Sequence, residues 1–273
     1  MSERDPQAAE KPPTASGDGS GGAVHPAEAG AVAGPAPILP VKKDGDLSGT
    51  LIVIEGTDGS GRSTQIALLT EWLESEGFAV QTMGLRRSAL IAKDIDDLLA
   101  KNAVTRMPLA LLYATDFFDQ LENRILPALR SGLVVLADRY FYTLIARAAV
   151  RGIKRDYLLG IYELALRPDL TFWLNVSPTV AFEREFQKSQ VISYWEAGRD
   201  MNLSNDLFKS FIRYQSMIKK EFENLAKRHN FNMLDGEASV PNVNRQLRER
   251  IAAHLGIKGL SFKPSPALLH LWR

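Results

Sequence analysis

The chain has 273 residues, of which 24% are charged and 45% hydrophobic, and its net charge is +1. This near-neutral balance gives no basic field that would favour a nucleic acid polymer or an anionic membrane as a partner. The absence of cysteine excludes disulfides, thiolate catalysis and cysteine-bound zinc. No apolar run approaches the roughly 20 residues that span a bilayer, and a cytoplasmic protein is expected.

Residues 1–47 differ in composition from the rest of the chain. They hold seven of the 14 prolines and seven of the 20 glycines, and almost no large apolar residue before Ile38. Such a segment buries too little surface to offset its chain entropy, so a disordered tail is predicted, either without chemistry of its own or with a regulatory partner. A folded domain is expected over residues 48–256, followed by a C-terminal extension over residues 257–273.

Short apolar runs alternate with amphipathic stretches along the folded part. The runs that predict strands are Leu51–Ile54, Phe78–Val80, Leu133–Leu136, Leu170–Leu174 and Phe231–Leu234. The stretches that predict helices include Ile66–Leu73, Pro108–Leu129 and Leu203–Lys227. Strand–helix alternation of this length predicts an α/β fold, with a parallel sheet flanked by helices on both faces.

The strongest functional signal follows the first predicted strand directly. It consists of Gly56, Thr57, Asp58, Gly59, Ser60, Gly61, Arg62, Ser63 and Thr64. Glycines let the backbone N–H groups wrap closely around phosphate oxygens, and the helix that follows adds the positive end of its dipole. The Ser63 hydroxyl is placed to bind Mg²⁺ that bridges the phosphates. The segment therefore predicts a P-loop that binds ATP with Mg²⁺.

Arg62 stands where the P-loop pattern has a lysine. Both side chains are cationic, so charge neutralisation of the β- and γ-phosphates is retained. The guanidinium is planar and bulkier than an ammonium group. Two interpretations follow: either the loop has adjusted to a forked donor, or nucleotide binding persists while catalysis is weakened.

A second polar motif, Asp138-Arg139-Tyr140, follows the third predicted strand. Open α/β sheets hold their ligands at the carboxyl ends of the strands, so this motif is expected beside the P-loop. Asp138 can reach the magnesium ion or its waters, which makes Ser63 and Asp138 the candidate metal ligands. Arg139 can clamp a phosphate through a bidentate guanidinium.

Four segments together resemble the thymidylate kinase family. They are Ile52–Gln65, Ile125–Tyr140, Arg167–Leu174 and Val180–Arg184, and the resemblance spans roughly residues 50–255. It implies a P-loop NTPase fold with a five-stranded parallel sheet and a mobile lid. The implied reaction passes the γ-phosphoryl group of ATP to thymidine monophosphate with Mg²⁺, giving dTDP for nucleotide biosynthesis. A homodimer is a further implication of the resemblance.

The resemblance also assigns roles to single residues. Asp58 would lie near a sugar hydroxyl of the acceptor nucleotide, and Arg139 would hold the acceptor phosphate. The P-loop backbone and Arg62 would bind the ATP phosphates. Arg62, Asp138 and Arg139 are therefore the candidate catalytic residues of the main domain.

A fourth candidate catalytic residue comes from the expected lid. The segment Ser189–Met201 lies where the family keeps its lid, and Arg199 is the candidate for a lid arginine that stabilises charge on the transferred group. Arg184 and Lys188 lie near enough in sequence to compete for that role.

Departures from the family pattern gather on the acceptor side. The family's Arg-Glu-Pro-Gly-Gly-Thr loop is replaced by a segment that contains Arg86 and Arg87. Phe117 stands where the family has an arginine that contacts the base, and it either stacks on a base or packs in the core. Arg147 and Ala148 replace a tyrosine and a glutamine. Losing polar groups that recognise a base is expected to relax or redirect specificity.

Three functions are consistent with these patterns. The first is a nucleotide kinase of the thymidylate kinase type. The second is a catalytically weakened P-loop protein that binds nucleotides in a regulatory role. The third is a related kinase with a different acceptor.

Overall fold

A computed structural model describes residues 47–259 and 269–270 of the chain. Almost all of the tail predicted over residues 1–47, and most of the extension predicted over 257–273, lies outside these residues. The proposed domain boundaries therefore stay predictions. No helix among the described residues is long and apolar enough to cross a bilayer.

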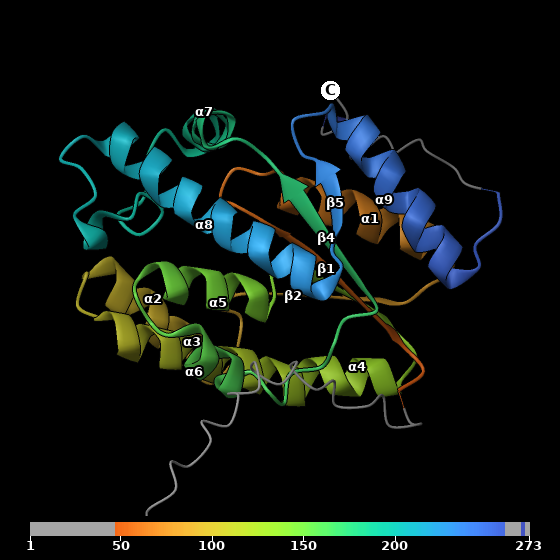
Figure 1. The fold of residues 1–273 in the computed structure, drawn as a ribbon. Coiled ribbons are helices and arrows are strands. Elements are labelled where there is room, and N and C mark those ends of the chain that lie inside the picture. Colours follow the sequence, from red (N-terminus) through yellow and green to blue (C-terminus); the bar gives the residue numbers. More distant parts are fainter. Residues whose placement is uncertain (1–46, 260–268, 271–273) are drawn as a thin grey trace, which may run out of the picture. The chain divides into compact units, whose positions relative to one another are not determined.

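The described residues form one parallel sheet of five strands, as predicted. The strands are β1 (Thr50–Gly56), β2 (Val80–Gly84), β3 (Val134–Asp138), β4 (Leu170–Asn175) and β5 (Asn232–Asp235). Their order across the sheet is β2-β3-β1-β4-β5, with every neighbouring pair parallel. The first strand in the sequence therefore lies at the centre of the sheet (Figure 1).

Helices connect the strands. They are α1 (Arg62–Ser75), α2 (Ala92–Ala100), α3 (Arg106–Gln120), α4 (Leu126–Arg130), α5 (Phe141–Val150), α6 (Arg155–Ile161), α7 (Pro178–Ser189), α8 (Leu207–His229) and α9 (Val240–Leu255). Figure 1 shows α1 and α9 on one face of the sheet, and α5 and α8 on the other. The prediction of helices on both faces is thus confirmed.

Two hydrophobic clusters attach these helices to the sheet. Leu51 and Val53 of β1 pack into the larger cluster, which contains residues of α3, α5 and α8. Ile52 and Ile54 point to the opposite face and pack with α1 and α9. Because side chains alternate between the faces of a strand, a strand covered on both sides needs an unbroken apolar run. That requirement explains why β1 was recognisable from sequence.

Most predicted elements differ from the structure by a few residues at their ends, and two differ more substantially. The second strand spans Val80–Gly84 rather than Phe78–Val80, since β2 is a half-buried edge strand in which polar residues interrupt the apolar run. The helix predicted over Pro108–Leu129 is divided into α3 and α4 by a π-helical turn over Leu121–Ile125. Pro127 lies at the start of α4, where its missing N–H costs little.

Candidate active site

The P-loop joins β1 to α1 through two glycines in the left-handed region. Gly59 has φ 75°, and a Cβ atom there would lie 2.2 Å from the carbonyl oxygen of Ala181 on α7. Gly61 has φ 88° and precedes the first residue of α1. Side chains at these positions would be strained, and at Gly59 would also collide with α7. The glycines are therefore required by the loop's path before any ligand binds.

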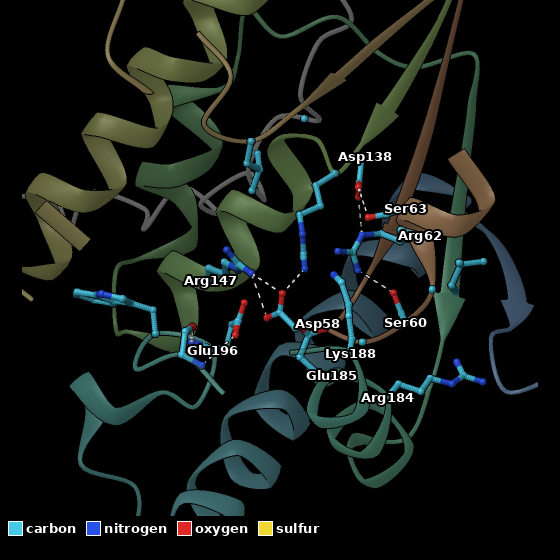
Figure 2. Close-up of a pocket in the computed structure, with 18 of the residues that line it drawn as sticks. Asp58, Ser60, Arg62, Ser63, Asp138, Arg147, Arg184, Glu185, Lys188 and Glu196 are labelled. Carbon is cyan, nitrogen blue, oxygen red and sulfur yellow. Dashed lines mark hydrogen bonds and ion pairs between the residues drawn. The ribbon is translucent and has the colours of Figure 1, made fainter. Parts of the chain in front are cut away.

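Arg62 turns into the loop rather than away from it. Its Nη1 donates to the carbonyl oxygens of Gly56, at 2.9 Å, and Thr57, and to Ser60 Oγ at 2.7 Å. Its Nε donates to Asp138 Oδ1 at 2.9 Å, and Figure 2 shows the guanidinium between Ser60 and Asp138. One guanidinium thus satisfies three loop oxygens and one carboxylate, which is the arrangement expected of a loop adjusted to a forked donor.

Ser63 and Asp138 meet at the start of α1. The Ser63 hydroxyl donates to Asp138 Oδ2 at 2.9 Å, although the two residues are 75 positions apart in the sequence. Burial alone would raise the pKa of Asp138, but the positive charges of Arg62 and Arg139 outweigh burial and hold it below its usual value. The pair therefore presents a hydroxyl and an ionised carboxylate beside the P-loop.

This pair fits a magnesium ion. Mg²⁺ prefers oxygen ligands and is held in phosphoryl-transfer sites by one or two protein oxygens, the rest being water and phosphate. Within the described residues there is no group of three or more His, Cys, Asp or Glu side chains that could hold a metal on its own. A site made of Ser63 and Asp138 accordingly needs the nucleotide phosphates to complete it.

Asp58 is the centre of a second cluster, reached from two helices (Figure 2). Arg139 Nη2 donates to its Oδ1 at 2.5 Å, and Arg147 Nη2 lies 3.0 and 3.1 Å from the two carboxylate oxygens. Gln215 Nε2 on α8 donates to Oδ2 at 3.1 Å. Arg139 also donates to the Gly56 carbonyl at 3.0 Å, so the cluster is joined to the P-loop backbone.

The electrostatics of this cluster keep Asp58 and Arg139 charged. Burial alone would raise the pKa of Asp58, but the cations of Arg147 and Arg139 outweigh burial and hold it far below its usual value. Burial and the charge of Arg62 lower the pKa of Arg139 to about 10, which leaves it protonated at neutral pH. Arg139 has φ 75°, an uncommon conformation for a side chain of this size, and its N–H bonds the Ile54 carbonyl at 3.0 Å.

Glu55, the last side chain of β1 before the loop, was not recognised from sequence. It is fully buried, and its Oε1 accepts the backbone N–H groups of Tyr140, at 2.9 Å, and Thr143, at 3.3 Å. The Thr143 hydroxyl donates to Oε2 at 2.5 Å. These bonds fix the start of α5, which follows Arg139 and carries Arg147. Desolvation raises the pKa of Glu55 to about 7, despite these hydrogen bonds.

We expect Glu55 to make stability depend on pH. Its pKa rises from 4.5 to about 7 on folding, so the unfolded chain loses the proton first as pH increases. The free energy of unfolding should fall by roughly 3 kcal/mol between pH 4.5 and pH 7, and no further above that. Glu55→Gln keeps an oxygen for the two N–H groups and removes this dependence. Chemical unfolding of both proteins at several pH values measures it.

A surface variant provides the control for this measurement. Glu223 on α8 is exposed, and Glu223→Gln should retain the wild-type pH dependence. If the unfolding free energies of wild type and Glu55→Gln differ by the same amount at pH 5 and at pH 8, the prediction is contradicted.

One cavity of about 1140 Å³ connects the two clusters. Of the nine P-loop residues predicted to bind ATP phosphates, Asp58–Thr64 line it, whereas Gly56 and Thr57 lie behind and supply carbonyls to Arg62. Asp138, Arg139 and Arg147 also line it. The cavity volume exceeds the 300–1,000 Å³ that holds one small ligand, which agrees with a site for two nucleotides.

The segment expected to be a lid is attached to the rest of the domain in this structure. Ser193–Glu196 line the cavity, and Trp195 Nε1 donates to the Leu99 carbonyl at 3.0 Å. Arg151 pairs with Asp200 through distances of 2.7 and 3.1 Å. Residues 193–200 therefore form a wall, of which residues 193–196 line the cavity, and it is held to α2 and to Arg151 at the end of α5.

Arg199 does not face the cavity in this structure, and the catalytic role expected for it stays a prediction. Its Nη1 donates to the carbonyls of Ser204, at 2.8 Å, and Asn205, at 2.9 Å, and it is not among the residues that line the cavity. Arg184 reaches the cavity edge but donates to the Gly236 carbonyl at 2.7 Å. Lys188, at the end of α7, lines the cavity and extends toward the P-loop (Figure 2). Arg184 and Lys188 are four residues apart and so lie on the same face of α7, and both line the cavity.

The departures on the acceptor side have separate outcomes. Phe117 is 1% exposed, and its ring contacts those of Tyr140, Phe141 and Tyr162 edge to face, so it belongs to the core. Arg86 and Arg87 line the cavity, and Arg86 pairs with Asp96 at 2.6 Å.

Comparison with known proteins identifies the family. A sequence profile described as thymidylate kinase matches residues 54–247, which is more than half of the chain. The chain belongs to the thymidylate kinase family. It is therefore an ATP-dependent nucleoside monophosphate kinase. The profile ends within α9, so it includes both the P-loop and the Asp58 cluster.

Individual relatives agree with the profile. The chain is 36% identical over 210 residues to a probable thymidylate kinase 2 of Saccharolobus solfataricus, covering 77% of this chain and 98% of the relative. It is 30% identical to a thymidylate kinase of Halothermothrix orenii, covering 75% of this chain and 97% of that protein. A probable thymidylate kinase of Pyrococcus abyssi is also 30% identical, over 64% of this chain and 86% of the relative.

Proposed function

We propose that this kinase transfers the γ-phosphoryl group of ATP to dTMP, giving dTDP. The observation that carries the proposal is the single cavity lined by the P-loop, the Ser63–Asp138 pair and the Asp58–Arg139 cluster. The relatives named thymidylate kinase supply the acceptor. Its cytoplasmic location and a homodimer stay predictions.

Phosphoryl transfer requires positioning and charge stabilisation more than covalent chemistry from the protein. On the donor side, the loop N–H groups and Arg62 would hold the ATP phosphates. On the acceptor side, Arg139 would bind the acceptor phosphate, and the Asp58 carboxylate would accept a hydrogen bond from a sugar hydroxyl. Because Arg139 also bonds the Gly56 carbonyl, the acceptor phosphate would be held directly beside the loop.

Ser63 and Asp138 would hold Mg²⁺ together with the nucleotide phosphates. The ion would neutralise charge on the phosphates and orient them for an in-line transfer. The ionised Asp138 and its Ser63 partner face the cavity before any ligand is bound, so little rearrangement is required of them.

Lys188 is the cation we propose to act on the transferring group from α7. Arg62 uses Nη1 on three loop oxygens and Nε on Asp138, which limits how far it can follow a moving phosphoryl group. Lys188 lines the same cavity at the end of a long flexible side chain. An ammonium group there can approach the charge that develops between donor and acceptor.

A coupled assay for ADP formation, with ATP and a panel of nucleoside monophosphates, tests the proposed reaction. We expect dTMP to give the highest kcat/KM, and analysis of the product to identify dTDP. A different best acceptor would identify a related kinase with another specificity. Formation of ADP at the same rate with and without every monophosphate would contradict a kinase function.

The magnesium assignment predicts the effect of Ser63→Ala. Removing the hydroxyl leaves Asp138 as the remaining protein oxygen of the proposed site, so the Mg²⁺ concentration for half-maximal rate should rise about 10- to 100-fold. Ser75→Ala, at the other end of α1, is the matched control and should leave that concentration unchanged. A Ser63→Ala variant with wild-type magnesium dependence would refute the assignment.

A further inference from the structure

Gln215 makes two contacts that connect the Asp58 cluster to the wall of residues 193–200. The side chain is 1% exposed and lies on α8, 157 residues from Asp58. Its Nε2 donates to Asp58 Oδ2 at 3.1 Å and to the Glu196 carbonyl at 3.0 Å. One amide nitrogen therefore bridges the P-loop carboxylate and the wall that lines the same cavity.

The orientation of this amide is fixed by its neighbours. Turning it over would place Oε1 against the Asp58 carboxylate and the Glu196 carbonyl, which are both acceptors. In the orientation present, Oε1 is buried and makes no hydrogen bond with the described residues. A buried oxygen without a partner is destabilising. A residue of similar size without that oxygen would pack at lower cost, so the amide is not explained by stability alone.

The hydrogen bonds of Asp58 suggest what the amide does. A carboxylate has about four acceptor positions; Arg139 and Gln215 each donate to one oxygen, and Arg147 Nη2 lies within hydrogen-bond distance of both. A hydroxyl of the acceptor nucleotide would take one of the two positions that the single Arg147 nitrogen covers. The two arginines hold the charge of Asp58, while Gln215 determines how its second oxygen faces the cavity wall.

We propose that Gln215 is a positioning residue for the acceptor nucleotide. It holds the Asp58 carboxylate in the orientation that receives the sugar hydroxyl, and it fixes the wall at Glu196 at the distance that encloses this sugar. The inference rests on the proposed function, in which Asp58 contacts the acceptor. Gln215 itself does not touch the reacting atoms.

Gln215→Met tests the inference, since it keeps the length of the side chain and removes both N–H contacts. We expect KM for dTMP to rise about 10- to 100-fold, with KM for ATP within twofold of wild type. The melting temperature should be unchanged or higher, because the unpaired oxygen is removed as well. Gln246→Met, on α9 across the sheet, is the matched control and should behave as wild type.

A dTMP analogue that lacks the 3′-hydroxyl makes the test specific for Asp58. Wild type should bind the analogue at least about tenfold more weakly than dTMP, because a hydrogen bond to a charged group is lost. In Gln215→Met, the affinities for dTMP and for the analogue should differ less than about threefold. Gln215→Asn keeps the amide but cannot reach both partners. Its difference in affinity between the two acceptors should lie between those of wild type and Gln215→Met.

Each outcome decides the inference. A Gln215→Met variant that loses stability and weakens ATP and dTMP equally would overturn it in favour of a structural role. Equal binding of the two acceptors by wild type would also overturn it, since Asp58 would then not read the hydroxyl. Failure of the proposed function gives a different result, since wild type itself would then phosphorylate no dTMP. If only the inference fails, wild type turns over dTMP and Gln215→Met has the same kinetic constants as wild type.

Discussion

Arg62→Ala is expected to reduce phosphoryl transfer by about 10³-fold. The substitution leaves the Gly56 and Thr57 carbonyls and Ser60 Oγ without their donor inside the loop, and Asp138 without its ion pair. The loop then loses both the cation for the phosphates and the contacts that hold its path. Turnover of ATP with dTMP measures the effect.

Arg62→Lys separates charge from shape. An ammonium group has three donors, enough for the same three loop oxygens, but no equivalent of the Nε contact to Asp138. We expect this variant to retain activity within about tenfold of wild type. Arg245→Ala, an exposed arginine on α9, is the control for loss of one positive charge. Wild-type activity that survives Arg62→Ala would refute this role of Arg62.

The same series addresses the weakened, regulatory interpretation of the P-loop. In a protein of that kind, wild type would bind ATP without transferring phosphate, and Arg62→Lys would gain slow transfer. The hydrogen bonds of Arg62 favour an adjusted loop instead, because one guanidinium satisfies all three oxygens that line the loop interior.

Asp58→Ala is expected to have the second largest effect, on acceptor use and on stability together. The carboxylate is paired with Arg139, which is buried, and with Arg147, which is partly buried, and both would be left without this counter-ion. Breaking a buried pair on one side costs about 3–5 kcal/mol of unfolding free energy. In addition, kcat/KM for the acceptor should fall by about 10³-fold, because no group is left to receive the sugar hydroxyl.

A second substitution tests the cause of the lost stability. If unpaired cations are responsible, Arg147→Met introduced into Asp58→Ala should recover part of the unfolding free energy. Activity should not recover, since the carboxylate is still missing. Asp96→Ala is the matched control: the Arg86–Asp96 pair is largely exposed, and its loss should cost about 1 kcal/mol or less. Equal costs for the two pairs would contradict the prediction.

The pH dependence of this stability has a definite sign. The pKa of Asp58 is depressed by Arg147 and Arg139, so its contribution is complete above its ordinary value of 3.8 and is lost as pH falls below that. The difference in unfolding free energy between wild type and Asp58→Asn should therefore be constant near neutral pH and shrink in acid. Glu55 has the opposite behaviour, because its pKa is raised.

The sequence determined the fold because its signals are local. The unbroken apolar run of β1 reflects burial on both faces, and the glycines at 59 and 61 reflect backbone conformations that other residues rarely adopt. The P-loop, the Ser63–Asp138 pair and the parallel sheet were recognisable for this reason. The prediction for the edge strand β2 overlaps it only at Val80, because a half-buried strand lacks that apolar run.

Only the tertiary structure decided how the acceptor side is assembled. The partners of Asp58 come from the β3–α5 connection, α5 and α8, and no periodicity or motif marks Gln215, which is 157 residues away. The direction of Arg199 away from the cavity, and of Lys188 toward it, depends on where α7 ends. These contacts form when elements that are distant in sequence pack together. No local sequence pattern therefore indicates them.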